Sequence, residues 1–190
     1  MKRLSRPLAI AAVTLFAALP AHARECADVR FPDRVNVEGT SLTLNGLGIR
    51  EATVFNVNVY VAALYVEQRS GNGAQILASD TKKRLVLRFL RDVDRADIVG
   101  AFQEGFQHSG GGGAMAPRVR QLNGWVPAAR EGASWTFTYV PGAGLHAAFG
   151  GRERGVVPGA DFARAFFGIW IGSHPPNPGL KRGLLGGPCG

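Results

Sequence analysis

Cysteine is scarce in this sequence, which has only Cys26 and Cys189 among its 190 residues. Two cysteines so far apart do not make a metal site without matching histidines, and His108, His146 and His174 show no ligand spacing. We therefore expect no metal and no cofactor. In an oxidising compartment the obvious use of the two thiols is one disulfide that joins the two ends of the chain. The alternative is that the terminal tails never come within bridging distance.

Long apolar runs are also absent, except near the start of the chain. Met1 is followed by a basic start, the apolar run LAIAAVTLFAAL and the small-residue pattern Ala21-His22-Ala23. These features favour a secretory signal peptide over residues 1–23, cleaved after Ala23, and the alternative is an uncleaved anchor. We expect a periplasmic or secreted protein with one domain over residues 24–190 and no transmembrane segment in the mature chain.

Basic residues outnumber acidic ones, with a formal net charge of +8, yet they are dispersed along the chain. Short basic clusters occur only at residues 82–84 and 181–182. The sequence has no basic helix with interleaved aromatic residues, which excludes nucleic acid as an expected partner. The excess charge is interpreted as a solubilising surface.

The most informative segment is residues 39–67, which we interpret as two long strands with Arg50 at the point where they meet. In the second strand, predicted over 53–67, side chains alternate between two faces. One face is wholly apolar. The other begins with Asn56, Asn58 and Tyr60 and ends with Ala62 and Leu64. Because buried polar groups need partners, this second face either meets water or lines a cavity for something polar at one end and apolar at the other.

The rest of the sequence is that of one α+β domain. Residues 68–79 are expected to form a loop, and 83–90 an edge or half-exposed strand. Asp94 is expected to cap a helix that runs to about Gln107, and Asp161 to open a second. The remaining expected elements are short strands at 31–37 and 41–47, a helical turn within 117–126, a strand meander at 134–140, 145–150 and 155–157, and a last short helix from Pro178.

Several segments resemble the chalcone isomerase family, and most closely its bacterial members with a secretion signal. They are NGLGIR at 45–50, VYVAALYVE at 59–67, FGIWIGSH at 167–174 and LKR at 180–182. The resemblance extends from about residue 31 to 186. It implies an open-faced β-sandwich, in which helices pack on one face of an antiparallel sheet and a ligand cleft lies between them.

The resemblance also implies roles for individual residues. Arg50 stands where the enzymes of the family hold their substrate, but Tyr60 stands in place of a threonine. Ile169 stands in place of a serine or threonine, and residues 105–125 contain no tyrosine. The resemblance therefore preserves little of the isomerase site, and the sequence weighs against an enzyme. Non-catalytic members of the family bind fatty acids through an arginine and a tyrosine, which Arg50 and Tyr60 resemble.

We therefore expect a binding protein for a small amphipathic carboxylate such as a fatty acid. Arg50 and Tyr60 would hold the carboxylate, Asn58 would add a third polar contact, and Ala62 and Leu64 would accept the apolar tail. One alternative function is an intramolecular lyase (isomerase) acting on a chalcone-like enone. Another is a protein-interaction scaffold with an exposed aromatic patch around Trp125 or Trp135. A structural alternative for Arg50 is an ion pair with Glu51, Glu38 or Asp161 that closes a turn.

Overall fold

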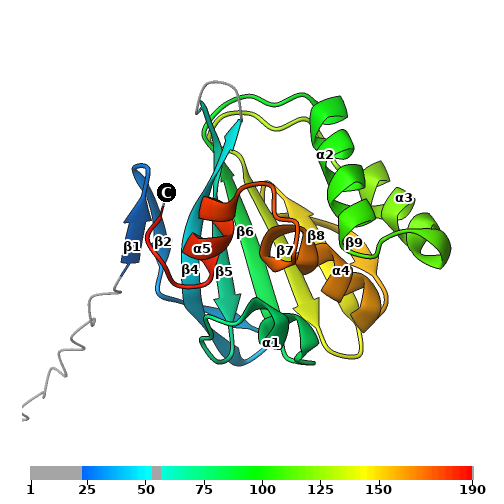
Figure 1. Ribbon diagram of the computed structural model, residues 1–190, viewed down its shortest axis with the longest axis horizontal. Coiled ribbons are helices and arrows are strands. Elements are labelled where there is room, and N and C mark those ends of the chain that lie inside the picture. Colours follow the sequence, from blue (N-terminus) through cyan, green and yellow to red (C-terminus); the bar gives the residue numbers. More distant parts are fainter. Residues whose placement is uncertain (1–22, 53–56, 190) are drawn as a thin grey trace, which may run out of the picture.

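A curled antiparallel sheet forms the body of the protein (Figure 1). The structure is a computed structural model that describes residues 23–52 and 57–189. The strand order is sequential from β3 to β9, and each strand pairs with its neighbours in the antiparallel sense. The strands are β3 (Arg34–Val37), β4 (Thr40–Ala52), β5 (Val57–Val66), β6 (Lys83–Phe89), β7 (Ser134–Val140), β8 (Gly144–Phe149) and β9 (Arg152–Val157).

The helices pack on one side of this sheet, as the predicted open-faced β-sandwich requires (Figure 1). They are α1 (Gly73–Ala78), α2 (Arg95–His108), α3 (Ala116–Trp125), α4 (Ala160–Ile171) and α5 (Pro178–Leu184), with a short 3-10 turn, η1 (Gly113–Met115), before α3. Helix α4 carries apolar residues on most of its sides and is almost entirely buried. Among the described residues, no helix combines the length and the hydropathy that crossing a membrane requires.

The two faces of β5 belong to two different cores, which confirms the predicted alternation. Ala62 and Leu64 lie in the larger core between the sheet and the helices. Val61, Ala63 and Tyr65 lie in a smaller core on the opposite face, with residues of β3 and β4. Both faces are therefore buried along this part of the strand. The start of the predicted strand, residues 53–56, lies outside the described residues.

The smaller core is closed by the two ends of the described chain. Strands β1 (Ala23–Cys26) and β2 (Val29–Pro32) form a separate hairpin beside β4. Cys26 forms a disulfide with Cys189, and the two Cα atoms are 6.1 Å apart. The predicted pairing is therefore present, and it fastens the segment after α5 to this hairpin. Such a bridge restricts the unfolded chain across a sequence separation of 163 residues.

Two predicted elements were wrong, and a third was predicted with two alternatives. The segment predicted as a loop contains α1, because the Asn72 side chain accepts a hydrogen bond from the Gln75 amide and Ile76 is buried. The segment predicted as an edge or half-exposed strand is β6, and it is the half-exposed alternative that is confirmed, because this central strand pairs with both β5 and β7. Its alternating pattern arises because it buries one face under the helices. The predicted turn within 117–126 is α3, a ten-residue helix.

Arg50 lies inside β4 rather than at its end. The prediction that Arg50 stands where two strands meet was therefore wrong. Strand β4 continues to Ala52, and its register with β5 shifts between Arg50 and Glu51. The side chain of Asp94 makes no capping hydrogen bond, although α2 begins at the next residue as predicted. The helices predicted from Asp161 and Pro178 are α4 and α5.

Glycines allow α5 to lie directly on the backbone of β4. A Cβ atom added to Gly46 would lie 2.0 Å from the Gly183 carbonyl oxygen, and one added to Gly48 would lie 2.4 Å from that of Leu180. The contact is mutual, because a Cβ on Gly183 would lie 2.1 Å from the Leu47 carbonyl oxygen. The Gly-x-Gly pattern before Arg50 therefore sets the distance between helix and strand.

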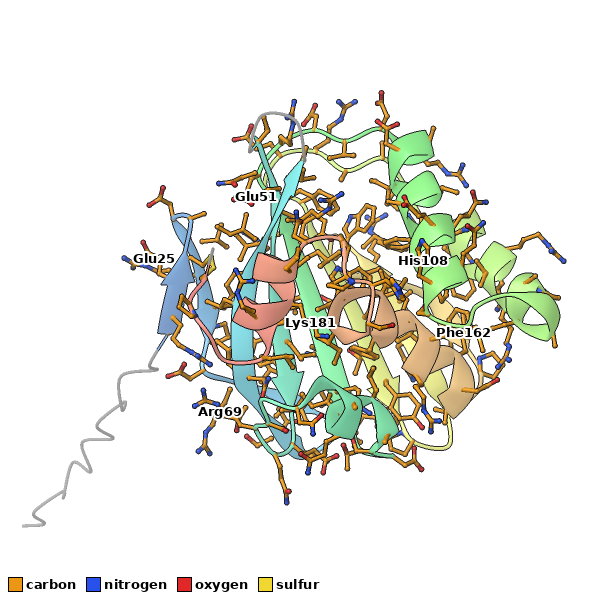
Figure 2. All side chains as sticks on the ribbon, in the orientation of Figure 1. Glu25, Glu51, Arg69, His108, Phe162 and Lys181 are labelled. Atoms are coloured by element: carbon orange, nitrogen blue, oxygen red, sulfur yellow. A yellow bond between two sulfur atoms is a disulfide. The ribbon has the colours of Figure 1, made fainter. Side chains whose placement is uncertain are left out.

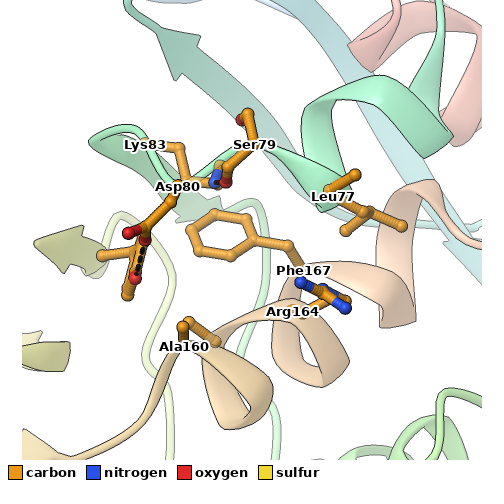
Figure 3. A pocket seen from close by; sticks show the side chains of 10 residues that line it. Leu77, Ser79, Asp80, Lys83, Ala160, Arg164 and Phe167 are labelled. Carbon is orange, nitrogen blue, oxygen red and sulfur yellow. Dashed lines mark hydrogen bonds between the residues drawn. The ribbon is translucent and has the colours of Figure 1, made fainter. Parts of the chain in front are cut away.

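Lys83, the first residue of β6, is buried between the sheet and the helices, beside a small cavity of about 30 Å³ (Figure 3). The residue is only 4% exposed. The ammonium group of Lys83 donates a hydrogen bond to the Ser79 carbonyl at 2.7 Å. The same group lies 5.0 Å from the centre of the Tyr139 ring, whose hydroxyl donates to Asp80. Burial lowers the pKa of Lys83 to about 8, and the nearby Asp80 carboxylate opposes this shift. The lysine therefore destabilises the fold when it is charged.

The close contact with α5 predicts that Gly48→Ala destabilises the protein by about 1–3 kcal/mol, since the helix must move away from β4. Urea unfolding would measure the change. The matched control is Gly100→Ala in α2, where an added Cβ meets no atom within 4 Å. That variant should be more stable than the parent by about 0.5–1 kcal/mol. Equal stability of Gly48→Ala and the parent protein would contradict this account of the contact.

The buried lysine predicts that stability rises with pH between about 8 and the ordinary lysine pKa of 10.5, because only the unfolded chain holds the proton in this range. The rise should reach about 3 kcal/mol at most. Urea unfolding at pH 7 and pH 10 would measure it, and Lys83→Met should lack this component. Lys82→Met, a change at the neighbouring lysine, should retain it. An identical pH dependence in the parent and Lys83→Met would refute the prediction.

Candidate functional site

Arg50 and Tyr60 lie directly opposite each other on β4 and β5. Paired residues of neighbouring strands project from the same face of a sheet, so the two side chains share a face. That face is the one covered by helices, because Tyr60 packs against the larger core and its hydroxyl contacts Trp170 of α4. The structure therefore brings together the two residues that the sequence pairs as a carboxylate site.

The Arg50 guanidinium is held by neutral oxygen atoms. Its Nη1 donates to the Oδ1 atom of Asn177 at 2.9 Å and to the backbone carbonyl of Glu51. Across the part of the chain that the structure describes, no ion pair includes Arg50. A partly buried cation held by neutral groups retains its full charge for an incoming anion.

The three acids proposed as alternative partners of Arg50 are engaged differently. Glu38 pairs with Lys82 at 3.4 Å, and Asp161 forms a two-point pair with Arg118. Glu51 contacts Arg50 only through its backbone carbonyl. The structural alternative, in which a carboxylate of this chain neutralises Arg50, is therefore wrong for the described residues.

The Tyr60 hydroxyl accepts a hydrogen bond from the indole N–H of Trp170 at 3.0 Å. Burial raises the pKa of Tyr60, while the Trp170 hydrogen bond and the Arg50 charge oppose the rise. The phenol therefore stays protonated at neutral pH. Because an indole can only donate, the Tyr60 O–H hydrogen remains free to donate to a further acceptor.

Asn177 is a site residue that the sequence reasoning missed. It stands before α5, and its side chain faces the end of β4 instead of capping its own helix. Besides accepting from Arg50, Oδ1 accepts from the Glu51 amide at 3.2 Å, and Nδ2 donates to the Glu51 carbonyl at 3.3 Å. Figure 2 labels Glu51 at this end of β4 and Lys181 on α5. The only sequence signal for Asn177 is its N-cap position before Pro178.

Asn58, the predicted third polar contact, is exposed and pairs with Glu51 across the register shift between β4 and β5. Asn177 is the amide that the structure places on Arg50. The predicted surface for an apolar tail is also covered, because Ala62 and Leu64 are 0% and 1% exposed within the core. A ligand tail can reach that part of β5 only if core side chains move.

Aromatic rings provide the apolar surroundings of Tyr60. Its ring packs edge to face on Phe89, with ring centres 5.6 Å apart. Phe89 in turn packs on Trp135, with ring centres 4.7 Å apart. Trp135 is 1% exposed and Trp125 packs against the core, so neither forms the exposed patch considered for a scaffold. Ile169, at the position of the hydroxyl residue in the isomerases, is also buried.

Within residues 23–52 and 57–189, His, Cys, Asp and Glu side chains form no cluster of three or more that could hold an ion. The three histidines lie in two places. His108 stacks on His174 with ring centres 5.3 Å apart, and His146 contacts Glu153 at 2.9 Å.

The chain was compared with known proteins by sequence and by structure. No curated protein sequence matches it. Among solved structures, the crystal structure of a fatty-acid binding protein from Arabidopsis thaliana is similar, with a TM-score of 0.70 and 16% sequence identity. The match covers 86% of this chain and 96% of the plant protein. At this identity the similarity establishes the fold. The family model described as chalcone isomerase-like matches residues 23–186. The chain therefore belongs to the chalcone isomerase-like family.

Proposed function

We propose that this protein is a non-catalytic binding protein for a small amphipathic carboxylate, such as a fatty acid, which it holds through Arg50 and Tyr60. The observation that carries the proposal is a partly buried guanidinium without an acidic partner among the described residues, placed opposite a phenol whose O–H is unused. The plant neighbour of the same fold is a fatty-acid binding protein, which supports the same class of ligand.

The chemistry of the two groups suits a carboxylate. A guanidinium offers parallel N–H donors that match the two carboxylate oxygens, and the bonds are strengthened by charge. Arg50 uses Nη1 on Asn177 and Glu51, which fixes the plane of the group. Tyr60 adds one O–H donor, whose direction is restricted by the bond from Trp170. A carboxylate between them would neutralise the charge and accept the free hydrogen.

The apolar part of the ligand would contact the aromatic rings beside Tyr60. Phe89 and Trp170 provide apolar surface within reach of the tyrosine, and both belong to the core rather than to a mobile surface. Because Ala62 and Leu64 are covered, we propose that a tail enters by displacing side chains between β5 and α4. Burial of a tail contributes about 0.8 kcal/mol for each methylene removed from water, which offsets this rearrangement.

An isomerase reaction has less support from the site. Closing a ring on an enone requires a polarised carbonyl and a positioned proton donor that are stabilised in the transition state. Ile169 supplies no hydroxyl. Arg50 and Tyr60 suffice to hold an anion in its ground state, which is the role that we assign to them.

We also propose that the protein belongs to the secreted bacterial branch of the family and works in the periplasm. The N-terminal 23 residues have the pattern of a cleaved signal, and the disulfide between Cys26 and Cys189 suits an oxidising compartment.

The location predicts that a bacterium expressing the full gene exports a chain that begins at Arg24. Intact-mass measurement of the periplasmic fraction should give residues 24–190 with the two hydrogens of the disulfide missing. Replacing the apolar run at residues 8–19 with polar residues should keep the protein in the cytoplasm. Recovery of the uncleaved chain from the membrane fraction would instead support an anchor.

The binding site predicts that the purified protein retains fatty acids and that Arg50→Ala loses them by about tenfold or more, since a charge-assisted pair is removed. Native mass spectrometry and extraction of the bound lipid would measure retention. Tyr60→Phe should weaken retention less, because it removes one neutral hydrogen bond.

The matched control is Arg88→Ala. Arg88 is also partly buried, but it pairs with Val61 and therefore lies on the opposite face of the sheet. This variant should retain lipid like the parent protein. Equal loss in both arginine variants, or no retention across a panel of fatty acids, would refute the proposal. Turnover of an enone that disappears in Arg50→Ala would favour the isomerase instead.

A further inference from the structure

A second polar site lies on the face of the sheet that the helices leave open. There, a groove of about 250 Å³ runs across β6, β7 and β8. One of its walls comes from the end of β3 and the other from β9. The groove is lined mainly by Arg84, Thr136, Thr138, His146, Glu38 and Glu153. Its volume lies just below the usual range of ligand pockets, which begins at about 300 Å³, so only a small molecule fits.

The floor of the groove is a row of side chains in cross-strand register. Arg84 of β6 pairs with Thr138 of β7, and Thr138 pairs with His146 of β8. Neighbouring strands are about 4.8 Å apart, so Arg84 and His146 stand roughly 10 Å from each other on either side of the threonine. The Arg84 side chain crosses part of this distance, because its Nε donates to the Thr138 hydroxyl on the strand between them.

Arg84 is a desolvated cation without a carboxylate partner among the described residues. Its Nε donates to the Thr138 hydroxyl at 2.8 Å, and no ion pair of those residues includes it. Burial lowers its pKa, and the nearby Tyr65 hydroxyl opposes this shift. The hydrogen bond to Thr138 fixes the guanidinium while the two Nη groups have no bond to the described residues.

His146 presents a hydrogen-bond acceptor. Its Nδ1 lies 2.9 Å from the Glu153 carboxylate, so this nitrogen donates to Glu153, and in the neutral imidazole Nε2 then carries the lone pair. Nε2 is shielded from water and has no partner among the described residues. A shift in register between β8 and β9, after Ala147, accompanies this pair. Such bulges often re-aim side chains beside functional sites.

We propose that this groove binds a small carboxylate that carries a hydrogen-bond donor, such as a hydroxyl group, next to the carboxylate. The carboxylate pairs with the Nη groups of Arg84, and the donor reaches Nε2 of His146 after a small movement of the ring. Glu38 and Glu153 also line the walls, where Glu38 pairs with Lys82 and Glu153 contacts His146. This site lies on the opposite face of the sheet from Arg50 and does not depend on the function proposed there.

Three molecules of equal carbon number test the proposal, namely lactate, propionate and propylene glycol, each titrated into the purified protein by calorimetry. Lactate should bind several-fold more tightly than propionate, since one hydrogen bond is added. Propylene glycol should bind about tenfold more weakly than lactate or not at all, because it lacks the charge. Backbone NMR shifts on lactate addition should map to Thr136, Thr138 and His146.

Two variants test the contributions of Arg84 and His146 separately. Arg84→Met should weaken lactate binding by about tenfold or more. His146→Phe should reduce lactate to the affinity of propionate and leave propionate unchanged. Urea unfolding checks that both variants fold. If Arg84→Met does not fold, His146→Phe and the NMR shifts still show whether lactate binds in the groove.

Arg50→Ala separates this site from the proposed fatty-acid site. It should bind lactate like the parent protein, and Arg84→Met should still retain fatty acid. Absence of lactate binding, equal affinity for lactate and propylene glycol, or NMR shifts around Arg50 instead of the groove would overturn the inference. Loss of lactate binding in Arg50→Ala would overturn it as well.

Discussion

The backbone contact between β4 and α5 is the constraint on which the candidate site depends. Gly46, Gly48 and Gly183 leave no side chain between the strand and the helix, so carbonyl groups of each approach the backbone of the other. At this distance Asn177, at the start of α5, reaches the edge of β4 and bonds to the Glu51 backbone on both sides. Arg50 is then held by a residue 127 positions away. The glycines thus affect the position of Arg50 indirectly, because they allow α5 to lie close enough to β4 for Asn177 to bind this arginine.

The same contact explains why the disulfide lies where it does. The chain leaves α5 close to β4 and returns to the hairpin of β1 and β2, where Cys189 meets Cys26. The hairpin covers the smaller core on the second face of β4 and β5. The polar groove lies on the same face of the sheet, across β6, β7 and β8. One face of the sheet is therefore covered by helices, and the hairpin covers part of the other.

The sequence predicted the strands and their faces well because periodicity reports burial directly. The alternation in β5 separates two cores, and the glycine-containing segment before Arg50 is a strand beside it. The sequence was a poor guide to the central place of β6, because a half-exposed central strand and an edge strand share the same alternation. The resemblance to a known family supplied the pairing of Arg50 with Tyr60. Asn177 was beyond either approach, since its contact depends on the packing of α5.

The basic cluster at residues 82–84 shows how much charge patterning leaves open. Three consecutive cations were interpreted as a solubilising surface, but the three side chains lie in different environments. Lys82 pairs with Glu38, Lys83 is buried under the helices, and Arg84 lies on the floor of the open groove. A run of like charges in a strand cannot be treated as one patch, because neighbouring residues face opposite sides of the sheet.

The role proposed for the site at Arg50 is to hold an anion, and the way its donors are fixed supports that proposal. Its two donors are fixed before any ligand arrives, Arg50 by Asn177 and Tyr60 by Trp170. Preorganised donors bind a stable carboxylate well, because the anion already carries its full charge. Catalysis would require donors that interact more strongly with charge that develops only in the transition state. Tyr60 is a weak acid made weaker by burial, so it gives up its proton reluctantly at neutral pH. A phenol of this kind donates a hydrogen bond to a carboxylate, and that role requires no transfer of the proton.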